Sequence, residues 1–150
     1  RSNTAGRWML SLPLKSVNNL VKDARKVQQT ILMVGDISDI YVTNFNTMTG
    51  DPNFTVEELS AIAFGYNRLL KESSDLLLDL KEVTTATGLS MTDKERLDII
   101  NRIYGEVLEY KNLTWYYTRK NIGVSYLRSK EKGDAARVLS LYGTHEQRYW

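Results

Sequence analysis

Apolar residues recur at steps of three and four along most of the chain, which is the spacing of one face of a helix. The first run, in which only Ser38 is polar, consists of Val17, Leu20, Ala24, Val27, Ile31, Val34, Ser38, Tyr41 and Phe45. A run sustained over about four heptads is typical of a coiled-coil seam. We therefore expect a first long helix over residues 14–46.

A second helix is expected after the turn-forming segment 47–53. Thr55 and Glu58 have the spacing of a capping box, and Phe54 precedes them as the apolar residue of a hydrophobic staple. The expected core positions of this helix are Leu59, Ile62, Tyr66, Leu69, Ser73, Leu76, Leu80 and Val83. The pattern predicts a helix over residues 55–87.

The third predicted helix is the longest. Thr92 and Glu95 form a second capping-box pair, and Gly133 is the kind of residue that ends a helix without steric cost. These signals predict a helix over residues 92–132. Its expected core positions are Leu97, Ile100, Ile103, Tyr104, Val107, Tyr110, Leu113 and Tyr117.

A short helix is expected over residues 134–142, with Asp134 as its N-cap. The residues expected to fold it onto the end of the third helix are Ala135, Val138, Leu139 and Leu141. Long helices joined by short connections run antiparallel to their neighbours. The sequence thus predicts an all-α fold, an elongated bundle of three long antiparallel helices with a short C-terminal helix.

The domain organisation follows from the same pattern. We expect a flexible N-terminal arm over residues 1–13, a single helical bundle domain over residues 14–143 and a tail over residues 144–150. The helix seams would also permit a homo-oligomer, because a seam does not distinguish packing within a chain from packing between chains. In that alternative, part of the third helix would pack against another chain.

Composition narrows the function classes. The chain has 150 residues, a formal net charge of +2, no cysteine and a single histidine, His145. These features provide no zinc site of ordinary composition, no thiol nucleophile and no Ser-His-Asp arrangement. The isolated glycines lack the spacing of a phosphate-binding loop, and no apolar run is long enough to span a membrane. We expect no catalytic residue, no cofactor and no metal.

The most informative cluster consists of aromatic and basic residues in the third helix, namely Trp115, Tyr116, Arg119, Lys120, Tyr126 and Arg128. Consecutive helical residues lie about 100° apart, so the aromatic run 115–117 cannot face one core seam and part of it is expected at the surface. Stacking of Trp115 with Arg119 and of Tyr116 with Lys120 would be a purely structural use. A protein-binding surface, in which Trp, Tyr and Arg are enriched, is the functional alternative.

A nucleic-acid-binding surface is a further alternative for this region. Phosphate contacts would come from Arg119, Lys120, Arg128, Lys130 and Lys132, and aromatic rings would stack on bases. The near-neutral charge of the whole chain makes nucleic acid the weaker interpretation, since phosphate binding depends on concentrated positive charge.

Residues 50–143 carry a pattern of positions that resembles the exported conjugal transfer proteins of Bacteroides-type conjugative transposons. In the second helix the matching positions are Phe54-Thr55 and Leu70-x-Glu72-Ser73. In the remainder they are Met91-x-Asp93-x-x-Arg96-Leu97-x-Ile99-Ile100-Asn101, Tyr110-x-x-Leu113, Asn121, Ser125-x-x-Arg128-x-Lys130-Glu131 and Leu141-Tyr142-Gly143. The first 50 residues and the absence of an export signal in the printed sequence depart from that family's pattern.

The resemblance implies a non-enzymatic helical component of a conjugative DNA-transfer apparatus related to type IV secretion. It implies that the protein works in the periplasm or cell envelope and that its partners are other transfer-apparatus proteins. The alternatives are a single-stranded nucleic-acid-binding module and a cytoplasmic regulatory helical bundle.

Overall fold

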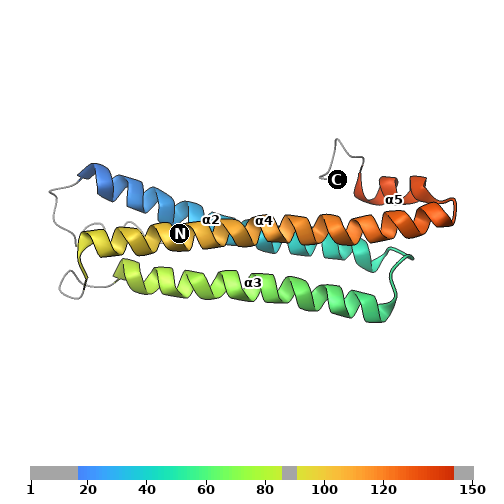
Figure 1. Cartoon of the computed structure of the whole chain (residues 1–150), viewed down its shortest axis with the longest axis horizontal. Helices are drawn as coiled ribbons and strands as arrows, with labels where there is room; N and C mark the ends of the chain where they lie inside the picture. Colours follow the sequence, from blue (N-terminus) through green and yellow to red (C-terminus); the bar gives the residue numbers. More distant parts are fainter. Residues whose placement is uncertain (1–16, 86–90, 144–150) are drawn as a thin grey trace. The chain divides into compact units, whose positions relative to one another are not determined.

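The computed structural model describes residues 17–85 and 91–143, with the side chains described from residue 22 onward in the first range. The helices are α2 (Val17–Thr49), α3 (Val56–Thr85), α4 (Asp93–Glu131) and α5 (Ala135–Tyr142) (Figure 1). The prediction of an all-α fold is confirmed, with three long helices packed together and one short C-terminal helix. The predicted arm and tail lie outside the described residues.

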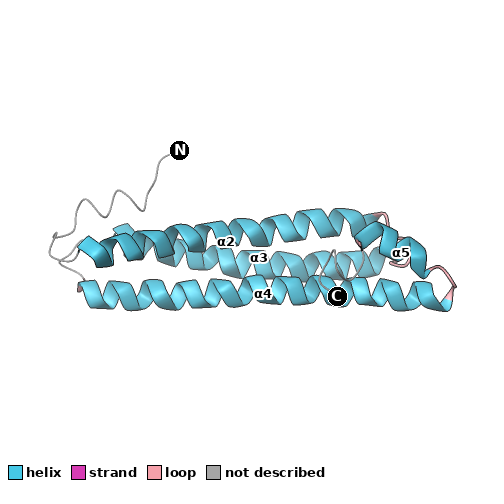
Figure 2. Ribbon diagram, turned by 90° about the horizontal axis from the view of Figure 1, so that it is seen from above, coloured by secondary structure: helices cyan, strands magenta, loops and turns pink. Residues whose placement is uncertain are grey.

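The chain divides into two compact units. The first unit comprises Arg1–Gly35 and Lys71–Tyr110, and the second comprises Asp36–Leu70 and Lys111–Trp150. In the described part of each unit, one segment of α2, one of α3 and one of α4 lie side by side (Figure 2). The second unit also contains α5 and the connection between α2 and α3. No helix in the described ranges has the length and apolarity needed to cross a bilayer.

Both predicted capping boxes are present. The Thr55 backbone amide donates to the Glu58 carboxylate at 2.9 Å, and the Glu58 amide donates to the Thr55 hydroxyl at 3.1 Å. Thr92 and Glu95 make the same reciprocal pair at 2.9 and 3.1 Å. Each box satisfies backbone N–H groups that have no partner inside the helix, which fixes where α3 and α4 begin.

The first helix extends past the predicted boundary at residue 46 and ends at Thr49. The Thr47 hydroxyl donates to the Thr43 carbonyl at 3.2 Å, and the Thr49 hydroxyl donates to the Asn46 carbonyl at 2.7 Å. Met48 between them is completely buried. Burial of Met48 thus extends the helix through residues 47–49, which the sequence pattern assigns to a turn.

The end of α4 is the predicted glycine stop. Gly133 has a φ of 72°, its amide donates to the Lys130 carbonyl at 3.1 Å, and the Asp134 amide donates to the Ser129 carbonyl at 2.7 Å. These two bonds form a Schellman motif, which satisfies the last carbonyls of α4. The predicted side-chain cap by Asp134 is wrong, because its carboxylate makes no capping bond and instead pairs with Arg137 at 2.9 Å.

The buried face of α2 is rotated relative to the predicted seam. Ile31, expected in the core, is 42% exposed, whereas Thr30 is completely buried. The Thr30 hydroxyl donates to the Lys26 carbonyl at 2.7 Å, so its polar group is satisfied inside the core. The seam positions Val27 and Val34 are buried as predicted. The prediction failed at this point because Thr30, whose hydroxyl bonds to the backbone of its own helix, occupies a core position. Apolarity alone assigns that position to its neighbour Ile31.

The C-terminal half of α4 shows a larger departure. Leu113, expected in the core, is 46% exposed. The buried positions that continue the face of Val107 are instead mostly small hydroxyl residues: Thr114, Thr118, Ile122, Ser125 and Ser129. In α5, Val138 is buried as predicted, but the expected core residue Leu141 is 38% exposed and Tyr142 is buried in its place.

An aromatic cluster fills the core of the second unit. The ring of Tyr66, which is completely buried, stacks on Tyr41 at a centroid distance of 4.7 Å. Tyr117 meets the same ring edge-on at 5.0 Å. The small buried side chains of α4 leave room for these large rings, since a close-packed interior balances large residues against small ones. This core holds the outer face of α4 in place.

Candidate protein-binding face

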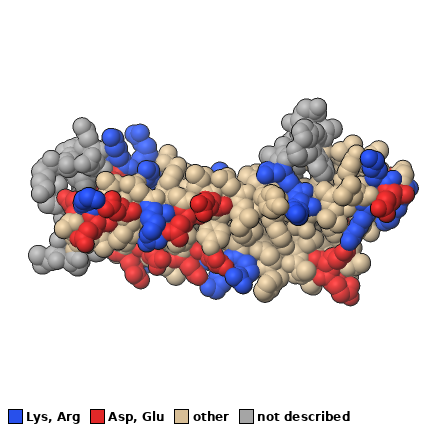
Figure 3. Space-filling view, viewed as in Figure 1, with Lys and Arg blue, Asp and Glu red and all other residues tan. Residues whose placement is uncertain are grey.

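Apolar side chains lie on the outside of α4 in the second unit. We define the outer stripe as Leu113, Tyr116, Lys120, Val124 and Leu127. Tyr116 is 52% exposed and Leu127 is 61% exposed, and Lys120 is the only charged member. Steps of three and four residues place the stripe on one side of the helix. These apolar side chains are exposed in the described part of the second unit, and uncharged side chains make up much of the visible surface of the molecule in Figure 3.

The outer stripe lies opposite a polar buried face. Thr118 is buried two residues after Tyr116, and Ser125 is buried two residues before Leu127. At about 100° per residue, a two-residue offset is about 200°, which is nearly the other side of the helix. The C-terminal half of α4 therefore turns hydroxyl groups inward and leucine, tyrosine and valine outward. This arrangement reverses the ordinary pattern of a helix in a soluble bundle.

The buried hydroxyls have internal partners. The Thr118 hydroxyl donates to the Thr114 carbonyl at 2.8 Å and lies 2.6 Å from the Tyr66 hydroxyl. The Ser129 hydroxyl donates to the Tyr126 carbonyl at 2.7 Å. These bonds remove most of the cost of burying polar groups. The polar inner face is consequently a stable packing surface, and it leaves the apolar outer face without a role inside the unit.

Tyr116 and Lys120 form a pair on the outer stripe. The Lys120 ammonium lies 5.6 Å from the centroid of the Tyr116 ring and 3.4 Å from its hydroxyl oxygen. This cation–π contact is the one that the sequence predicts for these two residues, and it holds the tyrosine ring on the surface. Part of the aromatic run 115–117 was expected at the surface, and Tyr116 is its exposed member.

Trp115 lies beside the outer stripe and is half-buried. It lines a cavity of about 410 Å³ together with Asp36, Asp39, Ile40, Thr43, Asn44 and Lys111. The Lys111 ammonium pairs with the Asp36 carboxylate at 3.0 Å. The cavity thus combines Trp115 with mostly polar and charged side chains, and it adjoins the outer stripe.

Two of the predicted binding residues serve the fold of the second unit. Arg128 donates to both carboxylate oxygens of Glu58, at 2.8 and 2.6 Å, and to the Asn53 carbonyl at 2.8 Å. The hydrogen bonds from Arg128 lower the pKa of Glu58 to about 2. Tyr126 packs against the aromatic core cluster. Because Arg128 and Tyr126 are engaged within the unit, Trp115, Tyr116 and Lys120 are the predicted binding residues that remain more accessible.

A buried polar network, which sequence reasoning missed, ties the α2–α3 connection to α4 and α5. Asp51 accepts from the Ser125 hydroxyl at 2.5 Å, from the Tyr142 hydroxyl at 2.8 Å and from the Asn53 backbone amide at 2.9 Å. Lys132 donates to the Asn53 side-chain oxygen at 2.9 Å. The sequence feature that could have indicated this network is the presence of Asp51 and Asn53 in the short α2–α3 connection, because Asp and Asn side chains in turns often bond to nearby backbone groups.

The cations near the outer stripe fall into two groups. Lys111 and Arg128 are paired with acids in the second unit. Arg119, Lys120 and Lys130 form no ion pair in the described part of the chain. Glu131 is the one acidic residue of α4 from residue 111 onward. The outer face of this segment therefore combines exposed apolar side chains with positive charge at Lys120 and beside it.

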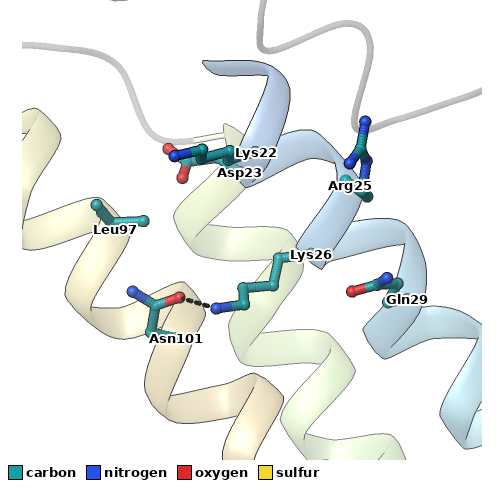
Figure 4. A pocket seen from close by; sticks show the side chains of 7 residues that line it. All are labelled: Lys22, Asp23, Arg25, Lys26, Gln29, Leu97 and Asn101. Atoms are coloured by element: carbon teal, nitrogen blue, oxygen red, sulfur yellow. Dashed lines mark hydrogen bonds between the residues drawn. The ribbon is translucent and has the colours of Figure 1, made fainter. Parts of the chain in front are cut away.

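A different cavity, of about 380 Å³, lies in the first unit (Figure 4). Its lining includes Lys22, Asp23, Arg25, Lys26 and Asn101, and the Lys26 ammonium donates to Asn101 at 2.9 Å. Asp23 is 6% exposed, and one of its carboxylate oxygens has no hydrogen-bond partner among the described residues. Burial raises the pKa of Asp23, and the nearby Asp93 raises it further. This carboxylate is therefore a local cost to stability.

Comparison of the chain with protein-family models, with curated proteins and with solved structures finds no match. Among residues 17–85 and 91–143, no group of three His, Cys, Asp or Glu side chains is arranged to hold a metal ion. Among the described surfaces, the outer stripe and the adjoining Trp115 cavity are the most distinctive.

Proposed function

We propose that this protein is a non-enzymatic adaptor that binds another protein through the outer stripe of α4 and the adjoining Trp115 cavity. The observation that carries the proposal is the reversed polarity of α4, with hydroxyl groups inward and Leu113, Tyr116 and Leu127 outward. Exposed apolar side chains that are contiguous and bordered by polar residues mark interaction surfaces more often than chance. Trp and Tyr are also the residues most enriched among those that dominate binding energy.

The setting that we propose is a conjugative DNA-transfer apparatus related to type IV secretion. The support is the resemblance of residues 50–143 to exported conjugal transfer proteins, together with an architecture of packed helices that offers an interaction face. In this setting the partner is another protein of the apparatus, and the protein acts in the periplasm or cell envelope. Fractionation of cells that express the complete gene tests the compartment.

Direct binding of single-stranded nucleic acid receives less support. Of the basic residues that would contact phosphate, Arg128 is paired with Glu58 and Lys132 donates to Asn53. Of these basic residues, only Arg119, Lys120 and Lys130 lack an acidic or amide partner within residues 17–85 and 91–143, which is a small footprint for a backbone-binding surface. A gel shift with single-stranded DNA at low ionic strength tests this alternative, and strong, salt-sensitive retardation would favour it.

The adaptor proposal is tested with a variant that carries both Trp115→Ala and Tyr116→Ala. In cells that contain the transfer apparatus, we expect the variant to recover much less of the other transfer proteins in a pull-down and to lower the transfer frequency. Helical circular dichroism should stay at the wild-type level. The matched control is Phe64→Ala, which truncates a 66% exposed aromatic residue of α3 in the same unit. Equal recovery of transfer proteins by all three chains would refute the proposal.

A further inference from the structure

The outer stripe has the geometry of a helix-binding seam. Its members, from Leu113 to Leu127, follow one another at steps of three, four, four and three residues, an average of 3.5. This is the period at which apolar residues of one helix meet those of a supercoiled partner helix. The stripe extends over about 21 Å of helix axis at 1.5 Å per residue. A surface of this shape fits a helix better than it fits a loop or a strand.

The charges of the stripe restrict that helix further. Lys120 lies at the middle of the seam, where a partner side chain would face it directly. Arg119 is its neighbour and borders the seam, and neither residue has an ion-pair partner in the described part of the chain. A cation within a helix seam is costly to desolvate unless an acid meets it, and polar seam positions fix which partner binds and in which register.

We propose that the partner of the outer stripe is an acidic amphipathic helix. Its apolar face has a period of 3.5 residues, an aspartate or glutamate stands opposite Lys120, and further acids lie along the edge that faces Arg119. This inference rests on the proposed adaptor function and specifies the chemistry of its partner. Pairing of two stripes about a two-fold axis at Lys120 brings the two ammonium groups together, so a second copy of this chain is the poorer occupant.

The test uses the complete chain and two synthetic peptides of about three heptads. Both peptides carry leucine at the seam positions. One has glutamate at the central seam position and along the flanks, and the other has lysine at the same places. Like charges on the flanks keep each peptide from pairing with itself. Fluorescence anisotropy of the labelled peptides gives the dissociation constants.

We expect the glutamate peptide to bind roughly tenfold more tightly than the lysine peptide, the effect of a few favourable ion pairs combined. The Lys120→Gln variant should reduce this preference, with the remainder due to Arg119, and Lys120→Glu should reduce it further. Both variants change an exposed side chain, so unchanged circular dichroism will show that the fold is intact. Leu127→Ser should weaken binding of the glutamate peptide, since it removes apolar surface without altering charge.

Three outcomes would overturn the inference. The first is equal affinity for the two peptides, and the second is no binding of either peptide. The third is a concentration-dependent dimer of the chain that the Leu127→Ser variant abolishes, which would make a second copy the occupant. In the first two cases, continued loss of transfer proteins in the pull-down with the Trp115 and Tyr116 variant would leave the adaptor function standing. The failure of one proposal is thus distinguishable from the failure of the other.

Discussion

The hydroxyl of Tyr117 occupies the space in which a side chain at Gly65 would begin. A β-carbon at residue 65 would overlap the Tyr117 hydroxyl and ring carbons, and that hydroxyl donates to the Ile62 carbonyl at 3.1 Å. The glycine thus allows α3 and α4 of the second unit to approach closely. The tyrosine ring, held in this position, forms part of the aromatic core behind the outer stripe.

Replacement of Gly65 by alanine should destabilise the protein, even though alanine favours helix. The Tyr117 ring must move from its position against Tyr66, and overpacking of this kind costs about 1–3 kcal/mol of unfolding free energy. Urea unfolding followed by circular dichroism measures the change. The matched control is Gly105→Ala in α4, where no atom of the described residues outside the neighbouring helix backbone lies within 4 Å of the added β-carbon. That variant should gain about 0.5–1 kcal/mol, and equal behaviour of the two variants would contradict the close approach.

The ion pair between Glu58 and Arg128 predicts that the stability of the protein falls as the pH is lowered. The pKa of Glu58 in the folded chain is about 2, mainly because Arg128 donates hydrogen bonds to it. A carboxylate with a lowered pKa stabilises the fold above its unfolded pKa and loses that contribution as the pH falls. Wild type should therefore exceed Glu58→Gln in stability at neutral pH, and the difference should shrink between about pH 4.5 and 2.

Glu57→Gln serves as the control for this measurement, since it changes the neighbouring acid outside the pair with Arg128. Its difference from wild type should stay small and should not follow the same profile. If Glu58→Gln matched wild type at neutral pH, the ion pair between Glu58 of α3 and Arg128 of α4 would be energetically unimportant.

The Tyr66 hydroxyl should lose its proton only at a higher pH than an ordinary tyrosine. Burial is the main reason that the pKa of its hydroxyl is raised to about 12, while the hydrogen bond with Thr118 opposes the rise. A raised pKa contributes stability that is present below the unfolded pKa and is lost as the pH rises through the folded one. We therefore expect stability to decline from about pH 10 to 12. In the Tyr66→Phe variant, the decline should be smaller.

The bond between Tyr66 and Thr118 is testable by itself. Thr118→Val keeps the shape of the side chain but leaves the buried Tyr66 hydroxyl without this partner. We expect a loss of about 1–3 kcal/mol in the free energy of urea unfolding, the cost of an unsatisfied buried polar group. An increase in stability would show that the polar inner face of α4 is not needed for packing.

The buried carboxylate of Asp23 should lower the stability of the protein at neutral pH. Burial raises the pKa of Asp23, which means that its site disfavours the ionised form of the carboxyl. Asp23→Asn should make the protein more stable at neutral pH, and the gain should diminish as the pH falls toward the ordinary pKa of an aspartate. Thermal unfolding at two pH values measures this, and a less stable variant at neutral pH would contradict it.

The helices could be predicted from the sequence because their signals are local. Capping residues and apolar spacing depend on neighbours within a few positions, and both boxes, at Thr55 and at Thr92, form as expected. The core face of α3 was predicted correctly at Ile62, Tyr66 and Leu80 for the same reason.

The inner face of α4 could not be predicted in this way. Thr114, Thr118 and Ser125 are core residues only because other segments supply partners, such as Tyr66 from α3 and Asp51 from the α2–α3 connection. A spacing rule that places leucine in the core and threonine at the surface therefore assigned Leu113 to the core incorrectly. Of the predicted binding residues, Arg128 is engaged by Glu58, an acid 70 positions away whose proximity no local pattern reveals.

The measurement that tests the adaptor account most directly is site-specific photocrosslinking in cells that contain the transfer apparatus. A photoreactive phenylalanine derivative replaces Tyr116 in one chain and Phe64 in another, and both positions are more than half exposed in the same unit. We predict that position 116 gives a discrete crosslink to another transfer protein and that position 64 does not. Crosslinks of equal strength from both positions, or none from position 116, would contradict the account.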